Sequence, residues 1–98
     1  MPKTIRDVDA SVGARLLLRR KELGLSQSAV GEKVGLTFQQ IQKYENGVNR
    51  ISAGVLYALS RVLEVPIKYF FEDCEPHSKG KASRKALRPD QLNAENDG

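Results

Sequence analysis

Residues 26 to 37 carry two helix-start signals separated by a glycine, and no other feature constrains the fold of this chain as strongly. Ser26 can cap a helix by accepting a hydrogen bond from a backbone N–H of the first turn. Thr37 stands three residues before Gln40, the spacing of a capping box. Gly35 can end the first helix because glycine adopts a left-handed backbone without a Cβ clash. The segment therefore predicts a helix, a tight turn and a second helix.

The second of these helices, expected over residues 38 to 46, has two contrasting faces when each residue is advanced by about 100°. Ile41 and Tyr44 share the inward face, flanked by Gln40 and Glu45. The outward face carries Phe38, Gln39, Gln42, Lys43 and Asn46. Glutamine can pair with adenine, lysine with guanine, and an aromatic ring with the thymine methyl, so this face suits the edges of DNA bases. A polar outward face is also normal for any surface helix.

Three short motifs in order along the chain resemble the lambda-repressor-like helix-turn-helix family of phage and bacterial repressors. They are residues 23–27 (LGLSQ), 33–35 (KVG) and 45–47 (ENG), and the resemblance covers about residues 9 to 72. It implies an all-α, compact five-helix DNA-binding domain whose third helix enters the major groove.

By position, the resemblance implies that Phe38, Gln39 and Lys43 contact base edges, with Gln42 beside them, and that Gln27 contacts a phosphate. Phe38 replaces the polar residue common at its position, which favours an apolar contact with a thymine methyl over a hydrogen bond.

The resemblance also pairs Arg20 on the first helix with Glu45 on the third. Such a bidentate contact would be structural and would tie the third helix to the domain. The alternative is two unrelated surface charges.

The loop after residue 46 contains further candidates for phosphate contact. Asn49 and Arg50 are expected beside the groove, where the loop would meet the DNA backbone. Arg50 could instead be a solvated loop charge. Asn46 could also reach a phosphate, although with Gly47 it is suited to ending the helix.

Three more helices are expected around the central pair. The first runs from Asp9 or Ser11 to Leu23 and buries Val12, Leu16 and Leu23. The fourth runs from about Ser52 to Leu63 and buries Val55, Leu56, Leu59, Val62 and Leu63. The last spans residues 67 to 71 and closes the core with Ile67 and Phe70, joined by Tyr69 and Phe71. Because these four large side chains exceed what one short helix needs for a small core, the cluster is also a candidate dimer interface.

The 98 residues and net charge of +4 allow one small, mildly basic domain. The chain divides into an N-terminal arm (1–8), the domain (9–73) and a mobile charged tail (74–98) that is poor in large apolar residues. The tail could contact DNA phosphates or a protein partner, or could simply be solvated.

No catalytic constellation is visible, and one cysteine and one histidine favour neither a disulfide nor a metal site. We therefore expect no cofactor, no enzymatic activity and no membrane segment, and a location in the cytoplasm on the nucleoid. The sequence predicts a transcriptional regulator, most simply a repressor that binds a palindromic operator in double-stranded DNA as a homodimer. The alternative is a protein-interaction module or the antitoxin of a toxin–antitoxin pair.

Overall fold

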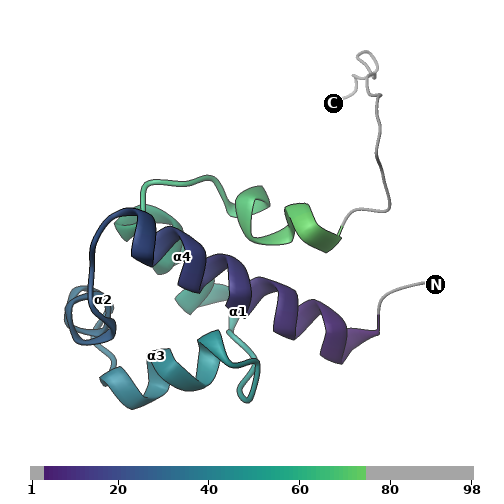
Figure 1. Ribbon diagram of the computed structural model, residues 1–98, viewed down its shortest axis with the longest axis horizontal. Coiled ribbons are helices and arrows are strands. Elements are labelled where there is room, and N and C mark those ends of the chain that lie inside the picture. The colour runs from purple at the N-terminus through teal and green to yellow at the C-terminus, as the bar shows by residue number, and fades with distance from the viewer. Residues whose placement is uncertain (1–3, 75–98) are drawn as a thin grey trace, which may run out of the picture.

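The structure is a computed structural model that describes residues 4–74, and the predicted tail beyond Cys74 lies outside them. Its elements in chain order are α1 (Ile5–Glu22), α2 (Gln27–Val34), α3 (Phe38–Glu45), α4 (Ala53–Val62) and a 3₁₀ helix, η1 (Ile67–Cys74). Figure 1 shows α1 as the long central helix, with α2 and α3 on one side of it and η1 on the other. The predicted all-α, five-helix fold is confirmed.

Helix α1 begins earlier than predicted. Thr4 and Asp7 form a capping box in which the Thr4 hydroxyl accepts from the Asp7 N–H and the Asp7 carboxylate accepts from the Thr4 N–H, both at 3.1 Å. The expectation that the helix starts at Asp9 or Ser11 is therefore wrong. Residues 5 to 8, placed in an N-terminal arm, are helical.

The helix-turn-helix unit has the predicted local structure. The Ser26 hydroxyl accepts from the Ala29 N–H at 2.9 Å and starts α2. Gly35 ends α2 with φ of 76°, in the left-handed region that glycine enters without strain. Thr37 and Gln40 form the predicted capping box of α3. The two helix starts and the turn are thus confirmed.

The core is small and apolar, and every helix contributes to it. Its buried side chains are Val12, Leu16, Val30, Ile41, Leu59, Leu63 and Phe70. Two core predictions are wrong: Leu23 and Ile67 are exposed. On α1 the inward stripe is Gly13, Leu16 and Arg20, at helical spacings of three and four. Leu23 continues this spacing, but α1 ends at Glu22 and Leu23 is its C-cap, so it falls at the rim of the core. Of the two residues of η1 that were expected to close the core, Ile67 and Phe70, only Phe70 is buried.

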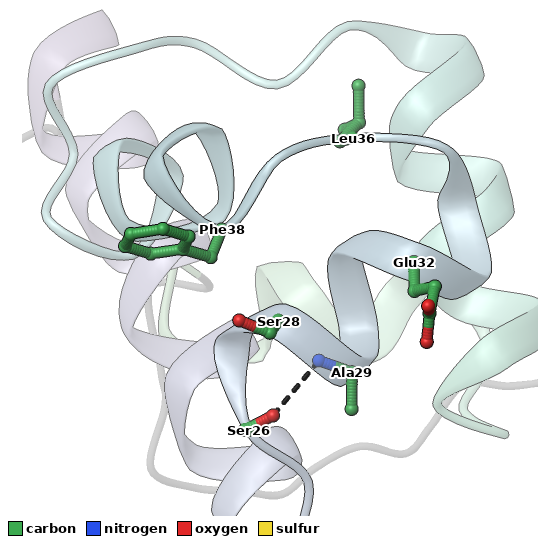
Figure 2. Close-up of a pocket in the computed structure, with 6 residues that line it drawn as sticks. All are labelled: Ser26, Ser28, Ala29, Glu32, Leu36 and Phe38. Atoms are coloured by element: carbon green, nitrogen blue, oxygen red, sulfur yellow. Dashed lines mark hydrogen bonds between the residues drawn. The ribbon is translucent and has the colours of Figure 1, made fainter.

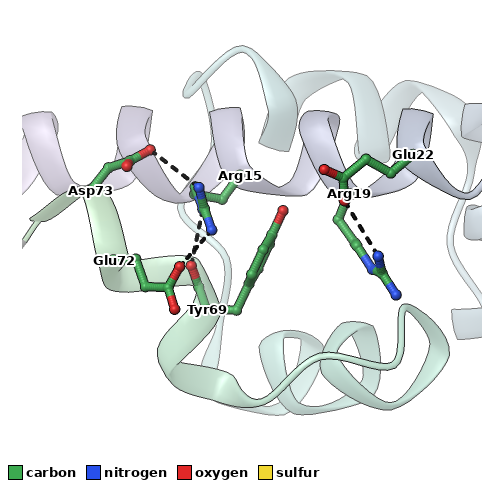
Figure 3. Close-up of polar contacts among 6 residues, drawn as sticks. All are labelled: Arg15, Arg19, Glu22, Tyr69, Glu72 and Asp73. Atoms are coloured by element: carbon green, nitrogen blue, oxygen red, sulfur yellow. Dashed lines mark hydrogen bonds and ion pairs between the residues drawn. The ribbon is translucent and has the colours of Figure 1, made fainter.

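Two arginines one turn apart on α1 hold the C-terminal segment (Figure 3). Arg15 donates from Nε to the Tyr69 carbonyl at 3.1 Å and from Nη2 to Glu72 at 2.7 Å, and its guanidinium lies 4.0 Å from the centre of the Tyr69 ring. Arg19 donates from Nε to the Leu63 carbonyl at 2.9 Å. The Arg15 contacts tie η1 to α1, and η1 extends to Cys74, past the predicted end at Phe71.

Candidate DNA-binding surface

The carboxylate of Glu45 fixes the end of α3 to two other helices. Arg20 donates to both Glu45 oxygens, from Nε to Oε2 and from Nη2 to Oε1, the latter at 3.0 Å. Gln27, the first residue of α2, donates from its side-chain amide to the same Oε1 at 2.9 Å. The hydrogen bond to Glu45 raises the pKa of Arg20, against the lowering effect of its desolvation. The structure therefore brings Arg20 and Glu45 together in a buried pair and adds Gln27, whose link to Glu45 the sequence did not indicate.

Gly13 lets α1 cross directly over the last turn of α3. A Cβ at this position would lie 2.1 Å from the carbonyl oxygen of Tyr44 and 3.0 Å from that of Glu45. Only a residue without a side chain permits this approach. Gly13 was not predicted from the sequence to be important, although a glycine inside an otherwise helical pattern was an available signal.

The outward face of α3 is accessible along its whole length. Phe38, Gln39, Gln42 and Lys43 are exposed, whereas Ile41 and Glu45 on the opposite side are buried. Helix α3 ends at Glu45, and Asn46 is its exposed C-cap, with its backbone N–H donating to the Gln42 carbonyl at 3.0 Å. The four exposed side chains Phe38, Gln39, Gln42 and Lys43 thus form one strip along the helix, which we call the α3 strip.

Phe38 stands at the N-terminal end of the α3 strip, beside a shallow groove between the starts of α2 and α3. Figure 2 shows the Phe38 ring at one end of this groove and Glu32 at the other. Phe38 is 47% exposed. An aromatic ring is therefore open to contact at the first position of the helix.

The loop that follows α3 folds back against α1. The Val48 and Asn49 N–H groups point to the Lys43 carbonyl, at 2.9 and 3.3 Å. Arg50 donates from Nε to the Asp9 carboxylate on α1, at 3.1 Å to Oδ2 and 3.4 Å to Oδ1. Asn49 and Arg50 are both exposed, but Arg50 is tied to α1. No local sequence signal indicated the role of Asp9, which lies 41 positions away.

Within residues 4–74, no group of three or more histidine, cysteine, aspartate or glutamate side chains is arranged to hold a metal ion. In the same part of the chain, no helix combines the length and the apolar character needed to cross a bilayer.

The model of a family described as helix-turn-helix matches residues 16–70, more than half of the chain. This chain belongs to that helix-turn-helix family. The match confirms the resemblance drawn from the sequence motifs and identifies a DNA-binding helix-turn-helix domain.

Relatives of this helix-turn-helix chain are named as regulators. An uncharacterized HTH-type transcriptional regulator of Sinorhizobium medicae strain WSM419 is 54% identical over 66 residues, which are 67% of this chain and 48% of the relative. An uncharacterized transcriptional regulator in the ATPase CF(0) region of Rhodospirillum rubrum is 53% identical over 73 residues, 74% of this chain and 68% of that protein. The chain thus spans about half the length of the first of these relatives.

A solved helix-turn-helix structure is also similar. The P22 c2 repressor protein, in complex with a synthetic operator, superimposes with a TM-score of 0.59 and 31% identity, over 62% of this chain and 92% of the repressor chain. The likeness therefore covers nearly all of the repressor chain and extends to its sequence.

Proposed function

We propose that this helix-turn-helix protein is a transcriptional repressor that binds a palindromic operator as a homodimer, with α3 in the major groove. The observation that carries the proposal is the division of α3 into a fixed face and an open one. Ile41 is buried and Glu45 is held by Arg20 and Gln27, while the α3 strip stays exposed. A rigidly held helix with a polar outward strip fits the groove geometry of helix-turn-helix proteins.

The α3 strip supplies the proposed base contacts. Gln39 and Gln42 offer the paired donor and acceptor that match adenine, and Lys43 offers donors to guanine O6 and N7. Phe38 offers an apolar surface to a thymine methyl. The strip thus contains a group suited to each of these three bases.

Phosphate contacts are proposed for the groups that flank the strip, namely Gln27, Asn46, Asn49 and Arg50. The side-chain amide of Gln27 has two hydrogens, and its bond to Glu45 uses one. The other can donate to a phosphate at the start of α2. Asn46, Asn49 and Arg50 are exposed around the C-terminal end of α3. Contacts of this kind set the register of a protein on DNA without reading its sequence.

Dimer formation is proposed because one recognition helix reads only a few base pairs. The η1 cluster remains the candidate interface, but its members differ in what they can offer. Phe70 is fully buried in the core and Tyr69 is covered by Arg15, whereas Ile67 is exposed and Phe71 is half-buried. We therefore propose the contact at Ile67 and Phe71. Such a repressor would act in the cytoplasm, on the nucleoid.

The test is selection of bound fragments from a randomised pool of double-stranded DNA, followed by a salt titration of the winning sequence. We expect an enriched palindrome whose half-sites lie about one helical turn apart. Gln39→Ala should change the preferred base at one position, at a cost of about 1–3 kcal/mol on the original site.

Arg50→Ala should weaken binding to every sequence and flatten the salt dependence. Arg61→Ala, which removes an exposed arginine from α4, is the matched control and should change neither the affinity nor its salt dependence. No enrichment by the wild-type protein would overturn the proposal and favour a protein-interaction module or an antitoxin.

A further inference from the structure

Arg50 differs from the three other arginines whose contacts build the fold. Arg15, Arg19 and Arg20 each bond a backbone carbonyl and a carboxylate, and all three side chains are largely covered. Arg50 is 67% exposed, and its contacts within residues 4–74 run from Nε alone, to the two oxygens of Asp9. One edge of the guanidinium is thus held by the protein, and its two Nη groups remain for another acceptor.

Asp9 is placed to hold that edge because the loop is fixed against α1 at the neighbouring position. A Cβ on Gly47 would lie 3.1 Å from the Ala10 Cα, so the backbone of the loop touches α1 beside Asp9. The Asp9 side chain is only 19% exposed in this contact. The Asp9 carboxylate therefore contacts Arg50 on the side that faces the protein, and the Nη groups of the guanidinium are on the side that faces away from it.

We propose that Asp9 is a positioning residue for DNA: its carboxylate orders the Arg50 side chain so that the Nη groups meet a backbone phosphate. The proposal rests on the phosphate contact proposed above for Arg50. A free arginine loses side-chain entropy when it binds a phosphate, and a side chain that is already ordered loses less. A planar guanidinium can satisfy a carboxylate and a phosphate on different edges at once.

Whether DNA affinity rises or falls when Asp9 is replaced distinguishes positioning of Arg50 from a simple effect of the Asp9 charge. Asp9 is an anion close to the proposed DNA contact, so electrostatics alone requires that its removal strengthen binding. Positioning requires the opposite result, and only while Arg50 is present. Asp9→Asn is the matched variant, because its carbonyl oxygen can still accept from the Arg50 Nε without carrying a charge.

The experiment measures the affinity of the wild-type protein, Asp9→Ala, Asp9→Asn, Arg50→Ala and the double alanine variant for one DNA duplex at several salt concentrations. Thermal unfolding of each protein confirms that it is folded. We expect Asp9→Ala to weaken binding by about two- to tenfold, the range for ordering one flexible side chain. We expect Asp9→Asn to bind at least as tightly as the wild-type protein, and Asp9→Ala to strengthen binding when Arg50 is already alanine.

Three results would overturn the inference. If Asp9→Ala strengthens binding in both backgrounds, Asp9 acts only through its charge. If it weakens binding equally in both, it supports the domain without acting through Arg50. If Arg50→Ala leaves affinity and salt dependence unchanged while the duplex is still bound, the phosphate contact itself is wrong, which separates that failure from a failure of Asp9.

Discussion

Replacing Gly13 by alanine tests the close crossing of α1 over α3. The added Cβ would meet the Tyr44 carbonyl oxygen at 2.1 Å, well below the 3.0 Å that real Cβ contacts respect. The obstacle is backbone, and it belongs to a helix end that is held through Glu45, so no side-chain rotation relieves it. One of the two helices must move.

The magnitude follows from two opposing terms. Overpacking a close-packed site costs about 1–3 kcal/mol, and a rigid backbone obstacle places this site at the upper end. Alanine recovers about 1 kcal/mol because it is the better residue inside a helix. We therefore expect Gly13→Ala to lower the free energy of unfolding by about 2 kcal/mol, which for a domain of this size lowers the melting temperature by roughly 10 °C.

Gly54→Ala is the matched control. It makes the same chemical change near the start of α4, where a Cβ meets nothing within 4 Å. With no clash to offset the gain in helix propensity, this variant should be stabilised by about 0.5–1 kcal/mol. Both variants are compared with the wild-type protein in urea and thermal unfolding experiments that are monitored by circular dichroism. A Gly13→Ala protein as stable as the wild type would refute the proposed crossing geometry.

Three further outcomes are expected. Arg20→Ala leaves the buried Glu45 carboxylate without its charged partner, with only the Gln27 amide still bonded to it, and should cost about 3–5 kcal/mol in urea unfolding; a loss below about 1 kcal/mol would show that the pair is not buried in solution. Replacing one thymine of the selected operator by uracil should weaken binding of the wild-type protein but not of Phe38→Ala, measured by fluorescence anisotropy, and equal losses in both would exclude a methyl contact by Phe38. Desolvation raises the pKa of Tyr69 above its ordinary value, and its hydroxyl is buried without a hydrogen-bond partner among residues 4–74, so Tyr69→Phe should be at least as stable as the wild type at neutral pH. Because the pKa of Tyr69 is higher in the folded protein than in the unfolded chain, Tyr69 ionises first in the unfolded chain once the pH passes about 10. The free energy of unfolding of the wild-type protein should therefore fall relative to that of Tyr69→Phe above this pH, and parallel pH profiles would contradict the raised pKa.

Features of the fold that depend on neighbouring residues were predictable from the sequence. The caps at Ser26 and Thr37 and the turn at Gly35 involve contacts within three or four positions, so their residue types identify them. The same logic should have found the Thr4–Asp7 box, but the apolar pattern used to place α1 begins later. Helical rotation also separated the α3 strip from the buried Ile41.

Features that depend on how helices pack were not predictable in the same way. Helical spacing placed Leu23 in the core, because the pattern does not reveal that α1 ends at Glu22 and leaves Leu23 as its cap at the rim. The pattern also gives no sign that a charged Arg20 occupies an inward position with a partner on another helix. Ile67 was misplaced for a related reason, since one phenylalanine of η1 is enough to close a small core. The Asp9–Arg50 contact joins residues 41 positions apart and has no local signature.

The buried face of α3 holds the helix in place and the exposed face is free for binding, so the binding specificity of such a protein can change independently of its fold. The side chains that keep the helix in place are Ile41, Tyr44 and Glu45. Among residues 4–74, no side chain of the α3 strip belongs to the core or bonds Glu45. Substitutions at exposed positions of this kind usually alter stability by no more than about 0.5 kcal/mol. The strip can therefore be exchanged for another set of side chains while the domain keeps its fold, so that new binding preferences can evolve, or be engineered, on an unchanged scaffold.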